Sequence, residues 1–465
     1  MFLKRVNSTL VLFFIAVVSV NAAPTELTGA QRLTQQGLTE TCISEPVFNG
    51  EACVFQANKS ASKTVVLVHG IAGEAANWFQ QIQKLKSNYH VLTFDLPGFG
   101  VSSKDNRLYS PTNYAKFIRF ITQKFAKDKF HLLGHSMGGA ISLRYAGMYP
   151  QDVDRLILVD AAGILHKHAY SRTVAAKWIN IVQRISYWAG PNLNGYASMV
   201  LEAIEEFMPV DMQQAIKSPE IRQMILRSNA IPISGVAMIT EDFSGVMKKV
   251  QSPTLIIWGE YDLVAPVRTG KILQANLNKA YLRVLANAGH SSMADRPIEF
   301  NQLMMNHLQQ SDKELAGSYW KARPFVKSQR VGKCSQGEQK LFEGTYAKIE
   351  LDNCTLAQIQ NAQIGQLVAR NSLVQMEYST IETSGIGLLS YDSEINLTSS
   401  TIRGDIAIQT VRSRLDVAGV KLTGNRVAIN NLSDSTIVFS LSWLQSSTYR
   451  GGKHEYLRLA ANESL

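Results

Sequence analysis

The sequence lacks the features that point to a membrane interior, a nucleic acid or a metal. Beyond its first 22 residues it has no apolar run close to the roughly 20 residues that a transmembrane helix needs. Its net charge of +10 is scattered, without a dense Lys/Arg run or an aromatic-interleaved basic patch, so it predicts no nucleic-acid partner. No Cys-x-x-Cys or histidine cluster indicates a metal site. These absences favour a basic, soluble surface, with weak attraction to acidic polymers or anionic lipid as the alternative.

Cysteine is scarce, with four residues in a chain of 465. They form two local pairs, Cys42 with Cys53 and Cys334 with Cys354, separated by 11 and 20 residues. In an exported protein this spacing favours two short disulfides, each stabilising the fold by roughly 3 kcal/mol. Free thiols are the alternative.

The N-terminus has the composition of a secretory signal. Lys4 and Arg5 give a charged start, an apolar run of 11 residues follows, and Val20 and Ala22 supply small residues for cleavage. We therefore expect a signal peptide over residues 1–22 and an exported protein that is periplasmic or secreted, with association with the envelope left open. An uncleaved anchor is the alternative.

Residues 63–310 alternate apolar runs with helical patterns. The runs are TVVLVHG, YHVLTFDLPGFG, KFHLLGHS, VDRLILVDAAG, SPTLIIWGEYD and AYLRVLANAGH, and each stops at Gly, Asp or His. Such alternation predicts an α/β domain over residues 23–310, with a mostly parallel sheet and helices on both faces. Open α/β sheets bind ligands at the carboxyl edge of their strands, where these polar turns lie.

The alternation stops over residues 164–250, which carry amphipathic helical patterns and no obvious strand. We expect a helical cap over the carboxyl edge of the sheet. Methionine adapts to irregular apolar ligands, although it also simply fills cores. The apolar residues of the cap that draw attention are Met199, Met208, Met212, Met224, Met238, Met247, Trp178 and Trp188.

The C-terminal part of the chain has a different character. Residues 311–333 are polar and aperiodic and predict a linker, whereas residues 334–465 carry a weak repeat of apolar, any, apolar, four unspecified residues, apolar. The copies are IELDNCTL (349–356), VQMEYSTI (374–381), INLTSSTI (395–402), LDVAGVKL (415–422) and IVFSLSWL (437–444). Short strands at this period predict an all-β domain that resembles a right-handed parallel β-helix, with a β-sandwich as the alternative.

A solenoid presents long flat faces that suit extended partners. We expect this domain to be separable from the chemistry and to contact envelope, glycan or a second copy of the chain. The alternative is that it buttresses the α/β domain.

The stretch Gly134-His135-Ser136-Met137-Gly138 has the pattern G-x-S-x-G between an apolar strand and a helical segment. This is the context of a nucleophile elbow, in which a sharp turn raises a serine above the sheet edge. The glycines are needed because neighbouring backbones come close there. Ser136 is therefore the candidate nucleophile.

A serine hydroxyl needs a base, and in this architecture the acid and the histidine follow the serine in that order. Asp262 stands just past one predicted strand and His290 just past the next. We expect His290 to accept the serine proton and Asp262 to orient the imidazole. Glu260 and Asp160 are alternative acids.

The remaining histidines near strands suit the base role less well. His135 lies in the elbow, where we expect it to pack or bond locally, and His69, His90 and His131 lie at strand edges and lack the required order.

Attack on a carbonyl places negative charge on its oxygen, which two backbone N–H groups can stabilise, each by roughly 3–4 kcal/mol. We expect these donors to be Met137, which follows the serine, and Ile71, in the turn after TVVLVHG. The glycines of HGIAG allow that turn to fold close to the site.

The segments LVHGIAG, DLPGFG, GHSMGG, WGEYDLVAP and AGHSSMADRP resemble the α/β-hydrolase superfamily, in the family's order and over about residues 60–310. Within it, HGIAGEAANW, DLPGFGVSS, LLGHSMGGAISLRYA and VDAAGI are most similar to the bacterial lipases called family V. They also resemble hydrolases that cleave carbon–carbon bonds in ring-fission products. Those enzymes usually have a GPG turn and a Trp after the catalytic His, where this chain has IAGE and HSS. Epoxide and haloalkane hydrolases need Asp at the elbow, so Ser136 argues against both.

The resemblance implies an exported serine hydrolase of the lipase/esterase type, with an ester of an apolar acyl group as substrate and no cofactor or metal. Another acyl hydrolase or a carbon–carbon hydrolase of the same fold is one alternative. A binding or adhesion protein built on an inactive hydrolase, with the β-helix as its working part, is the other.

Overall fold

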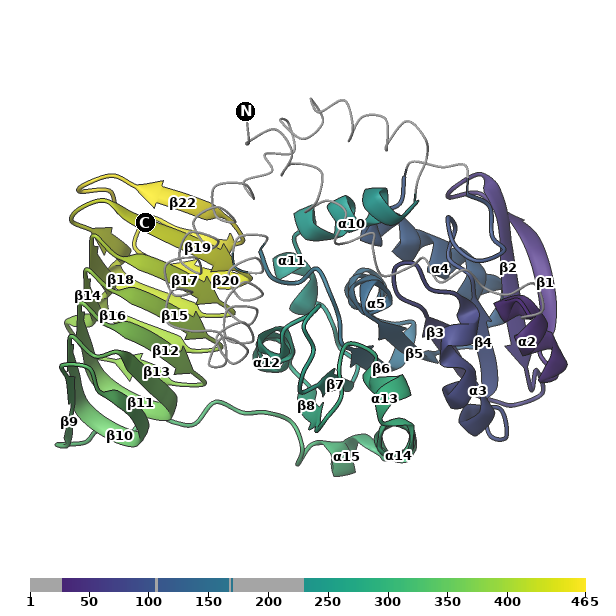
Figure 1. Ribbon diagram of the computed structural model, residues 1–465, viewed down its shortest axis with the longest axis horizontal. Helices are drawn as coiled ribbons and strands as arrows, with labels where there is room; N and C mark the ends of the chain where they lie inside the picture. Colours follow the sequence, from purple (N-terminus) through teal and green to yellow (C-terminus); the bar gives the residue numbers. More distant parts are fainter. Residues whose placement is uncertain (1–26, 105–107, 167–168, 170–229) are drawn as a thin grey trace, which may run out of the picture.

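The computed structural model describes residues 27–104, 108–166, 169 and 230–465 (Figure 1). The predicted signal peptide and residues 167–168 and 170–229 of the predicted cap lie outside the described residues. Trp178, Trp188 and all of the named methionines except Met238 and Met247 also lie outside them. Within the described part of the chain, no helix has the length and hydropathy needed to cross a bilayer.

The N-terminal half is built on an eight-stranded sheet with the order β1-β2-β4-β3-β5-β6-β7-β8. Its first two strands are antiparallel to their neighbours and the other six are parallel, so the predicted mostly parallel sheet is confirmed. The strands are β1 (Thr39–Glu45), β2 (Gly50–Ala57), β3 (Thr64–Val68), β4 (His90–Phe94), β5 (Phe130–His135), β6 (Val153–Val159), β7 (Thr254–Gly259) and β8 (Ala280–Leu285).

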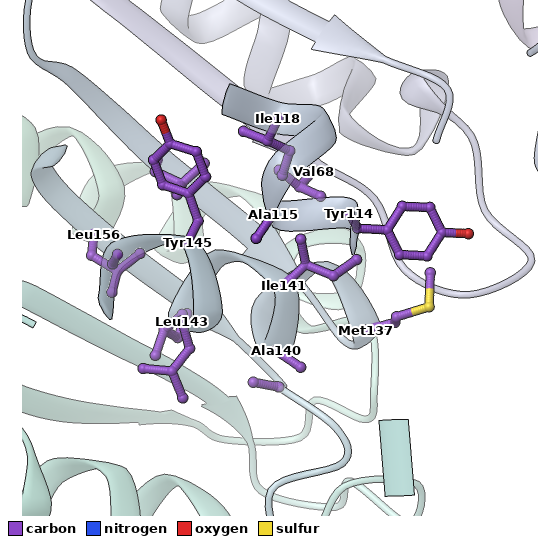
Figure 2. Close-up of a cluster of buried hydrophobic side chains, with 14 of the residues drawn as sticks. Val68, Tyr114, Ala115, Ile118, Met137, Ala140, Ile141, Leu143, Tyr145 and Leu156 are labelled. Atoms are coloured by element: carbon purple, nitrogen blue, oxygen red, sulfur yellow. The ribbon is translucent and has the colours of Figure 1, made fainter. Parts of the chain in front are cut away.

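Alternate residues of a strand point to opposite sides of the sheet. Both sides carry apolar residues here, and helices cover each of them. Val66 and Val68 of β3 pack into one core, and Val65 and Leu67 pack into the other. Figure 2 shows the first core, where Val68 lies beneath α4 and α5. The helices on that face are α4 (Pro111–Phe125), α5 (Met137–Met148) and α12 (Val267–Asn276), and those on the other are α2 (Gly29–Gln35), α3 (Phe79–Leu85) and α14 (Pro297–Gln309).

The described residues 230–250 of the predicted cap include two helices, and a cap over the sheet edge stays a prediction. The two helices are α10 (Ala230–Thr240) and α11 (Ser244–Met247). Met238 and Met247 are buried in the core that includes α4 and α5, so these two side chains fill the core.

The C-terminal part is an all-β region whose strands form one 14-stranded sheet. The strands that share the repeat pair in parallel, so that Val374, Ile395, Leu415 and Ile437 lie side by side in successive rows. Its strands are β9 (Val331–Ser335), β10 (Gln339–Asp352), β11 (Leu356–Arg370), β12 (Leu373–Glu377), β13 (Thr380–Glu382), β14 (Ile386–Tyr391), β15 (Glu394–Thr398), β16 (Thr401–Val411), β17 (Arg414–Ala418), β18 (Lys421–Asn431), β19 (Ser435–Ser440), β20 (Ser442–Gln445), β21 (Arg450–Lys453) and β22 (Tyr456–Leu459).

The predicted position of the first copy of the repeat, residues 349–356, is wrong. Ile349 pairs with Leu367, whereas the residue beside Val374 is Ala357. The sequence AQIQNAQI (357–364) fits the same template. Its first apolar position is a small alanine and the intervening residues are mostly polar, so the apolar pattern is weak.

The corners of this domain explain the serines of the repeat. Tyr378 and Ser399 have left-handed φ values of 48° and 49°, and a serine follows each. The hydroxyl of Ser379 accepts a hydrogen bond from the N–H of Ala362 (3.0 Å), and that of Ser400 accepts one from the N–H of Ser379 (3.2 Å). The serines thus satisfy buried backbone donors at each corner, where the strand ladder is interrupted.

The structure contains both predicted disulfides. Cys42 and Cys53 join paired positions of β1 and β2, and Cys334 joins β9 to Cys354 in the turn after β10. Two disulfides indicate a protein that works outside the reducing cytoplasm. The predicted linker, residues 311–333, contains α15 (Asp312–Leu315) and the start of β9, and the boundary at residue 334 stays a prediction.

Candidate active site

Ser136 stands in a sharp turn between β5 and α5. Its backbone has φ 53° and ψ −120°, a strained conformation that costs of order 1–3 kcal/mol. A methyl group on Gly134 would lie 2.1 Å from the carbonyl oxygen of Gly138, and one on Gly138 would lie 2.3 Å from that of Val68. Only glycine fits at these two positions, which explains the G-x-S-x-G pattern.

The structure brings Ser136, His290 and Asp262 into one hydrogen-bonded row. Ser136 Oγ lies 2.8 Å from His290 Nε2, and His290 Nδ1 lies 2.9 Å from Asp262 Oδ2. Asp262 is fully buried, Ser136 is 4% exposed and the His290 side chain is 21% exposed. A neutral imidazole in this row donates Nδ1–H to the carboxylate and leaves Nε2 to accept the serine proton.

The loop after β7 fixes the carboxylate of Asp262. Its Oδ1 accepts hydrogen bonds from the N–H groups of Val264 and Ala265, both at 2.8 Å. A methyl group on Gly259 would lie 2.0 Å from the carbonyl oxygen of Gly289, so glycine lets this loop approach the one that carries His290. One oxygen of Asp262 is therefore held by its own loop while the other faces the imidazole.

The alternative acids bind elsewhere. Asp160, after β6, accepts hydrogen bonds from the N–H groups of Gly259 (2.8 Å) and Ser292 (3.0 Å). Burial, followed by the negative charge of Asp262, raises the pKa of Asp160 to about 7. Glu260 is exposed and accepts a hydrogen bond from the N–H of Asn287 (3.2 Å). Asp160 thus ties together the loops that carry Asp262 and His290.

The turn after β3, which carries Ile71, lies against Ser136. A methyl group on Gly70 would lie 3.0 Å from Ser136 Cβ. His69 holds this turn: its Nδ1–H donates to the carbonyl oxygen of Gly70 (2.7 Å), and its Nε2 accepts from the N–H of Leu96 (2.9 Å). Acceptance by Nε2 requires a neutral ring, and burial lowers the pKa of His69 to about 4.

Met137 is the first residue of α5, directly after Ser136. The N–H groups of a first helical turn have no partner within their helix. The backbone N–H of Met137 is therefore suited to stabilise negative charge at this end of the helix.

His135 has a role that the sequence did not reveal. Its Nε2 lies 2.7 Å from the backbone carbonyl oxygen of His290, so the ring donates to the loop of the candidate base. Burial, and next the nearby His290, lowers the pKa of His135 to about 3. We expected a local contact, but its partner is 155 positions away, and a single sequence carries no signal for such a pairing.

His90 and His131 lie away from this row. His90 contacts Thr64 Oγ1 (3.1 Å), and His131 Nδ1 lies 3.5 Å from an Asp154 carboxylate oxygen. Both residues are near the amino ends of parallel strands, opposite the edge that carries Ser136.

Among the described residues, one group of side chains has the spacing of metal ligands, Glu40 with Cys42 and Cys53. Its sulfurs are joined in a disulfide and are not thiolate ligands. The expectation of no cofactor or metal stays a prediction.

The buried histidines predict how the free energy of unfolding depends on pH. Burial lowers the pKa to about 4 for His69 and His131 and to about 3 for His135 and His307. Below pH 6.5 the unfolded chain binds these protons and the folded chain does not, so stability falls as the pH falls. The raised pKa of Asp160 offsets one of the four protons between pH 7 and 4. We expect the free energy of unfolding to drop by about 4 kcal/mol per pH unit between pH 6 and 4.5.

Urea unfolding followed by circular dichroism at several pH values measures this slope. His307→Gln should make the slope shallower by about one proton, or roughly 1.4 kcal/mol per pH unit. A constant unfolding free energy from pH 7 to 4.5 would contradict the assignment of neutral buried rings.

The sheet order, the turn at Ser136 and the row of polar residues at the carboxyl edge define an α/β-hydrolase fold. Residues 63–193 match the family model described as alpha/beta hydrolase fold. This part of the chain is therefore similar to the α/β-hydrolase superfamily and has its fold.

Relatives of this chain include lipases and other hydrolases. It is 27% identical over 309 residues to Lipase 1 of Psychrobacter immobilis, covering 63% of this chain and 94% of the relative. It is 26% identical to monoacylglycerol lipase abhd6-B of Xenopus laevis, covering 56% of this chain and 80% of the relative. Among solved structures, an esterase from Exiguobacterium antarcticum is 20% identical with a TM-score of 0.44, covering 58% of this chain and 100% of that one. Lipases are thus among the proteins to which this chain is similar.

Proposed function

We propose that this protein is an exported serine hydrolase that cleaves carboxylic esters through an acyl-enzyme. One observation carries the proposal: Ser136 Oγ and Asp262 Oδ2 bind opposite nitrogens of the His290 ring, at 2.8 and 2.9 Å. This arrangement suits acyl transfer, in which one histidine both removes and returns a proton.

In the first half of the reaction, Ser136 Oγ attacks the ester carbonyl carbon and its proton passes to His290 Nε2. The N–H groups of Ile71 and Met137 stabilise the oxyanion, each by roughly 3–4 kcal/mol. When the intermediate collapses, the alcohol leaves with the proton from His290. The acyl group stays on Ser136.

In the second half, His290 takes a proton from water, and the hydroxide oxygen attacks the acyl carbon. Collapse of this intermediate returns the proton to Ser136 and releases the carboxylic acid. Asp262 stabilises the imidazolium in both halves, and the neutral rings of His69 and His135 hold the two loops in place.

Export and the C-terminal architecture are part of the proposal. The signal-like residues 1–22 and the two disulfides support export to the periplasm or the medium. Parallel pairing of successive rows with serine corners supports a parallel β-helix over residues 334–465. The resemblance of the elbow segments to family V lipases supports placement in that group.

The α10 helix supports an apolar acyl group. Its sequence AIPISGVAMIT has no charged residue, and a methyl group on Gly235 would lie 3.8 Å from Ile71 Cδ1. Each buried CH₂ contributes about 0.8 kcal/mol, or roughly a fourfold gain in kcat/KM. We therefore expect medium or long acyl chains to exceed acetate by at least several-fold. A series of p-nitrophenyl esters from acetate to palmitate measures this, and a flat or reversed profile contradicts it.

A fluorophosphonate probe tests the proposed function itself. Wild type should be labelled at Ser136, and Ser136→Ala should not be. Failure to label either protein favours a binding protein built on an inactive hydrolase. Labelling without ester turnover directs attention to the other acyl hydrolases or to carbon–carbon cleavage, which a ring-fission product as substrate would detect.

A further inference from the structure

The α12 helix connects the candidate site to the C-terminal domain. It begins at Val267, two residues after Ala265, whose N–H binds Asp262 Oδ1. The carbonyl oxygen of Ala265 accepts a hydrogen bond from buried Trp258 Nε1 (2.7 Å). A shift at the start of α12 therefore moves the loop that fixes the Asp262 carboxylate.

Arg268, in the first turn of α12, is bound entirely by the C-terminal domain. Its Nη1 and Nη2 donate to the two carboxylate oxygens of Asp416, at 2.6 and 3.1 Å. Nε donates to Thr398 Oγ1 (2.7 Å), and Nη2 also donates to the carbonyl oxygen of Leu397 (2.9 Å). The side chains of Arg268 and Asp416 are 13% and 4% exposed, so this pair is shielded from water.

The corner residues of successive rows hold the rest of α12. The hydroxyl of Tyr378 donates to Gln274 Oε1 (2.8 Å), and that of Ser399 donates to the carbonyl oxygen of Lys271 (3.0 Å). At the next corner, a methyl group on Gly419 would lie 2.9 Å from Ile272 Cγ2, so only glycine fits against the helix. Figure 1 shows α12 on the side of the α/β domain that faces the C-terminal strands.

A second contact lies at the end of the domain nearest the cap. The N–H of His166 donates to Ser440 Oγ (3.0 Å), and Lys248 Nζ lies 2.9 Å from the centre of the Trp443 ring. The C-terminal domain thus contacts His166 and Lys248, which lie at the two ends of the predicted cap in the sequence. These contacts favour the alternative that the domain buttresses the α/β domain.

We propose that the C-terminal domain sets the position of Asp262 through Arg268, which makes Arg268 and Asp416 positioning residues for the site. A planar guanidinium with four hydrogen bonds has one well-defined orientation, and its backbone leads directly into the acid loop. Loss of the fork leaves a shielded charge unpaired, and the first turn of α12 then moves away to solvate it.

Asp416→Asn in the full chain tests the inference, with Asp392→Asn as its matched control. Asp392 also binds an arginine in a two-bond fork, Arg412 at 2.7 and 2.7 Å, but both side chains are exposed. We expect Asp416→Asn to lower kcat for a soluble ester by about 5- to 50-fold with KM within twofold, because a misplaced acid weakens the base but not substrate binding. Asp392→Asn should leave both constants unchanged.

Arg268→Lys is the second variant, because it keeps the charge and loses the fork. It should lower kcat about as much as Asp416→Asn. Equal kcat values for wild type and either variant, at full folding by circular dichroism, would overturn the inference.

Hydrogen–deuterium exchange of peptides over residues 262–276 gives a readout that needs no substrate. Exchange there should rise several-fold in Asp416→Asn and Arg268→Lys and stay at the wild-type rate in Asp392→Asn. Unchanged exchange in the two folded variants would also overturn the inference. If wild type lacks ester turnover, the proposed function fails, and this exchange experiment still decides the role of Arg268.

Discussion

Ser136→Ala is expected to lower kcat for any ester substrate by on the order of 10⁴- to 10⁶-fold, since it removes the atom that forms the acyl-enzyme. The protein should fold as before, because the elbow depends on Gly134 and Gly138, whose added methyl groups would meet backbone oxygens at 2.1 and 2.3 Å. Alanine at φ 53° replaces a serine under the same strain, so stability should change by no more than about 1 kcal/mol.

Ser142→Ala is the matched control for this variant. Ser142 lies within α5 and is fully buried, and within the described structure its Oγ has no hydrogen-bond partner. Ester kinetics and thermal unfolding of the two variants separate chemistry from folding. Near wild-type turnover in Ser136→Ala, or an equal loss in Ser142→Ala, would show that the nucleophile is elsewhere.

The parallel sheet could be predicted because its strands are buried on both faces and therefore appear as continuous apolar runs. The candidate site could be located because each such run ends in a polar turn at one edge. β1 and β2 escaped prediction because TETCISE and GEACVFQA contain charged residues within short strands. Their pairing is antiparallel and is reinforced by the Cys42–Cys53 disulfide rather than by an unbroken apolar sequence.

The contacts between distant segments had no signal in the sequence. Asp416 lies 148 positions after Arg268, and the carbonyl oxygen of His290 is 155 positions after His135. Arginine, aspartate and histidine are all common on protein surfaces. In the sequence these side chains therefore look like ordinary exposed residues. The prediction of a separable C-terminal domain failed to anticipate the α12 interface for the same reason.

The sequence leaves two aspartates as candidates for the acid, because Asp160 and Asp262 each follow a predicted strand. The structure separates their roles by what each carboxylate accepts. Asp262 Oδ1 takes two N–H groups of its own loop, so Oδ2 alone faces His290. Both oxygens of Asp160 take backbone N–H groups, of Gly259 and Ser292.

Asp262→Asn should therefore lower kcat by about 10⁴-fold. The single amide oxygen will face Val264 and Ala265, whose N–H groups need an acceptor, so the NH₂ group turns toward His290 Nδ1. That nitrogen must then accept, which moves the ring proton to Nε2 and leaves no lone pair for the proton of Ser136. Asp160→Asn should cost less than about tenfold in kcat, because the hydrogen bonds that Asp160 accepts come from Gly259 and Ser292 and reach neither Ser136 nor the His290 ring. Measurement of kcat for both variants at pH 8 decides the assignment, and the opposite order of losses would identify Asp160 as the acid.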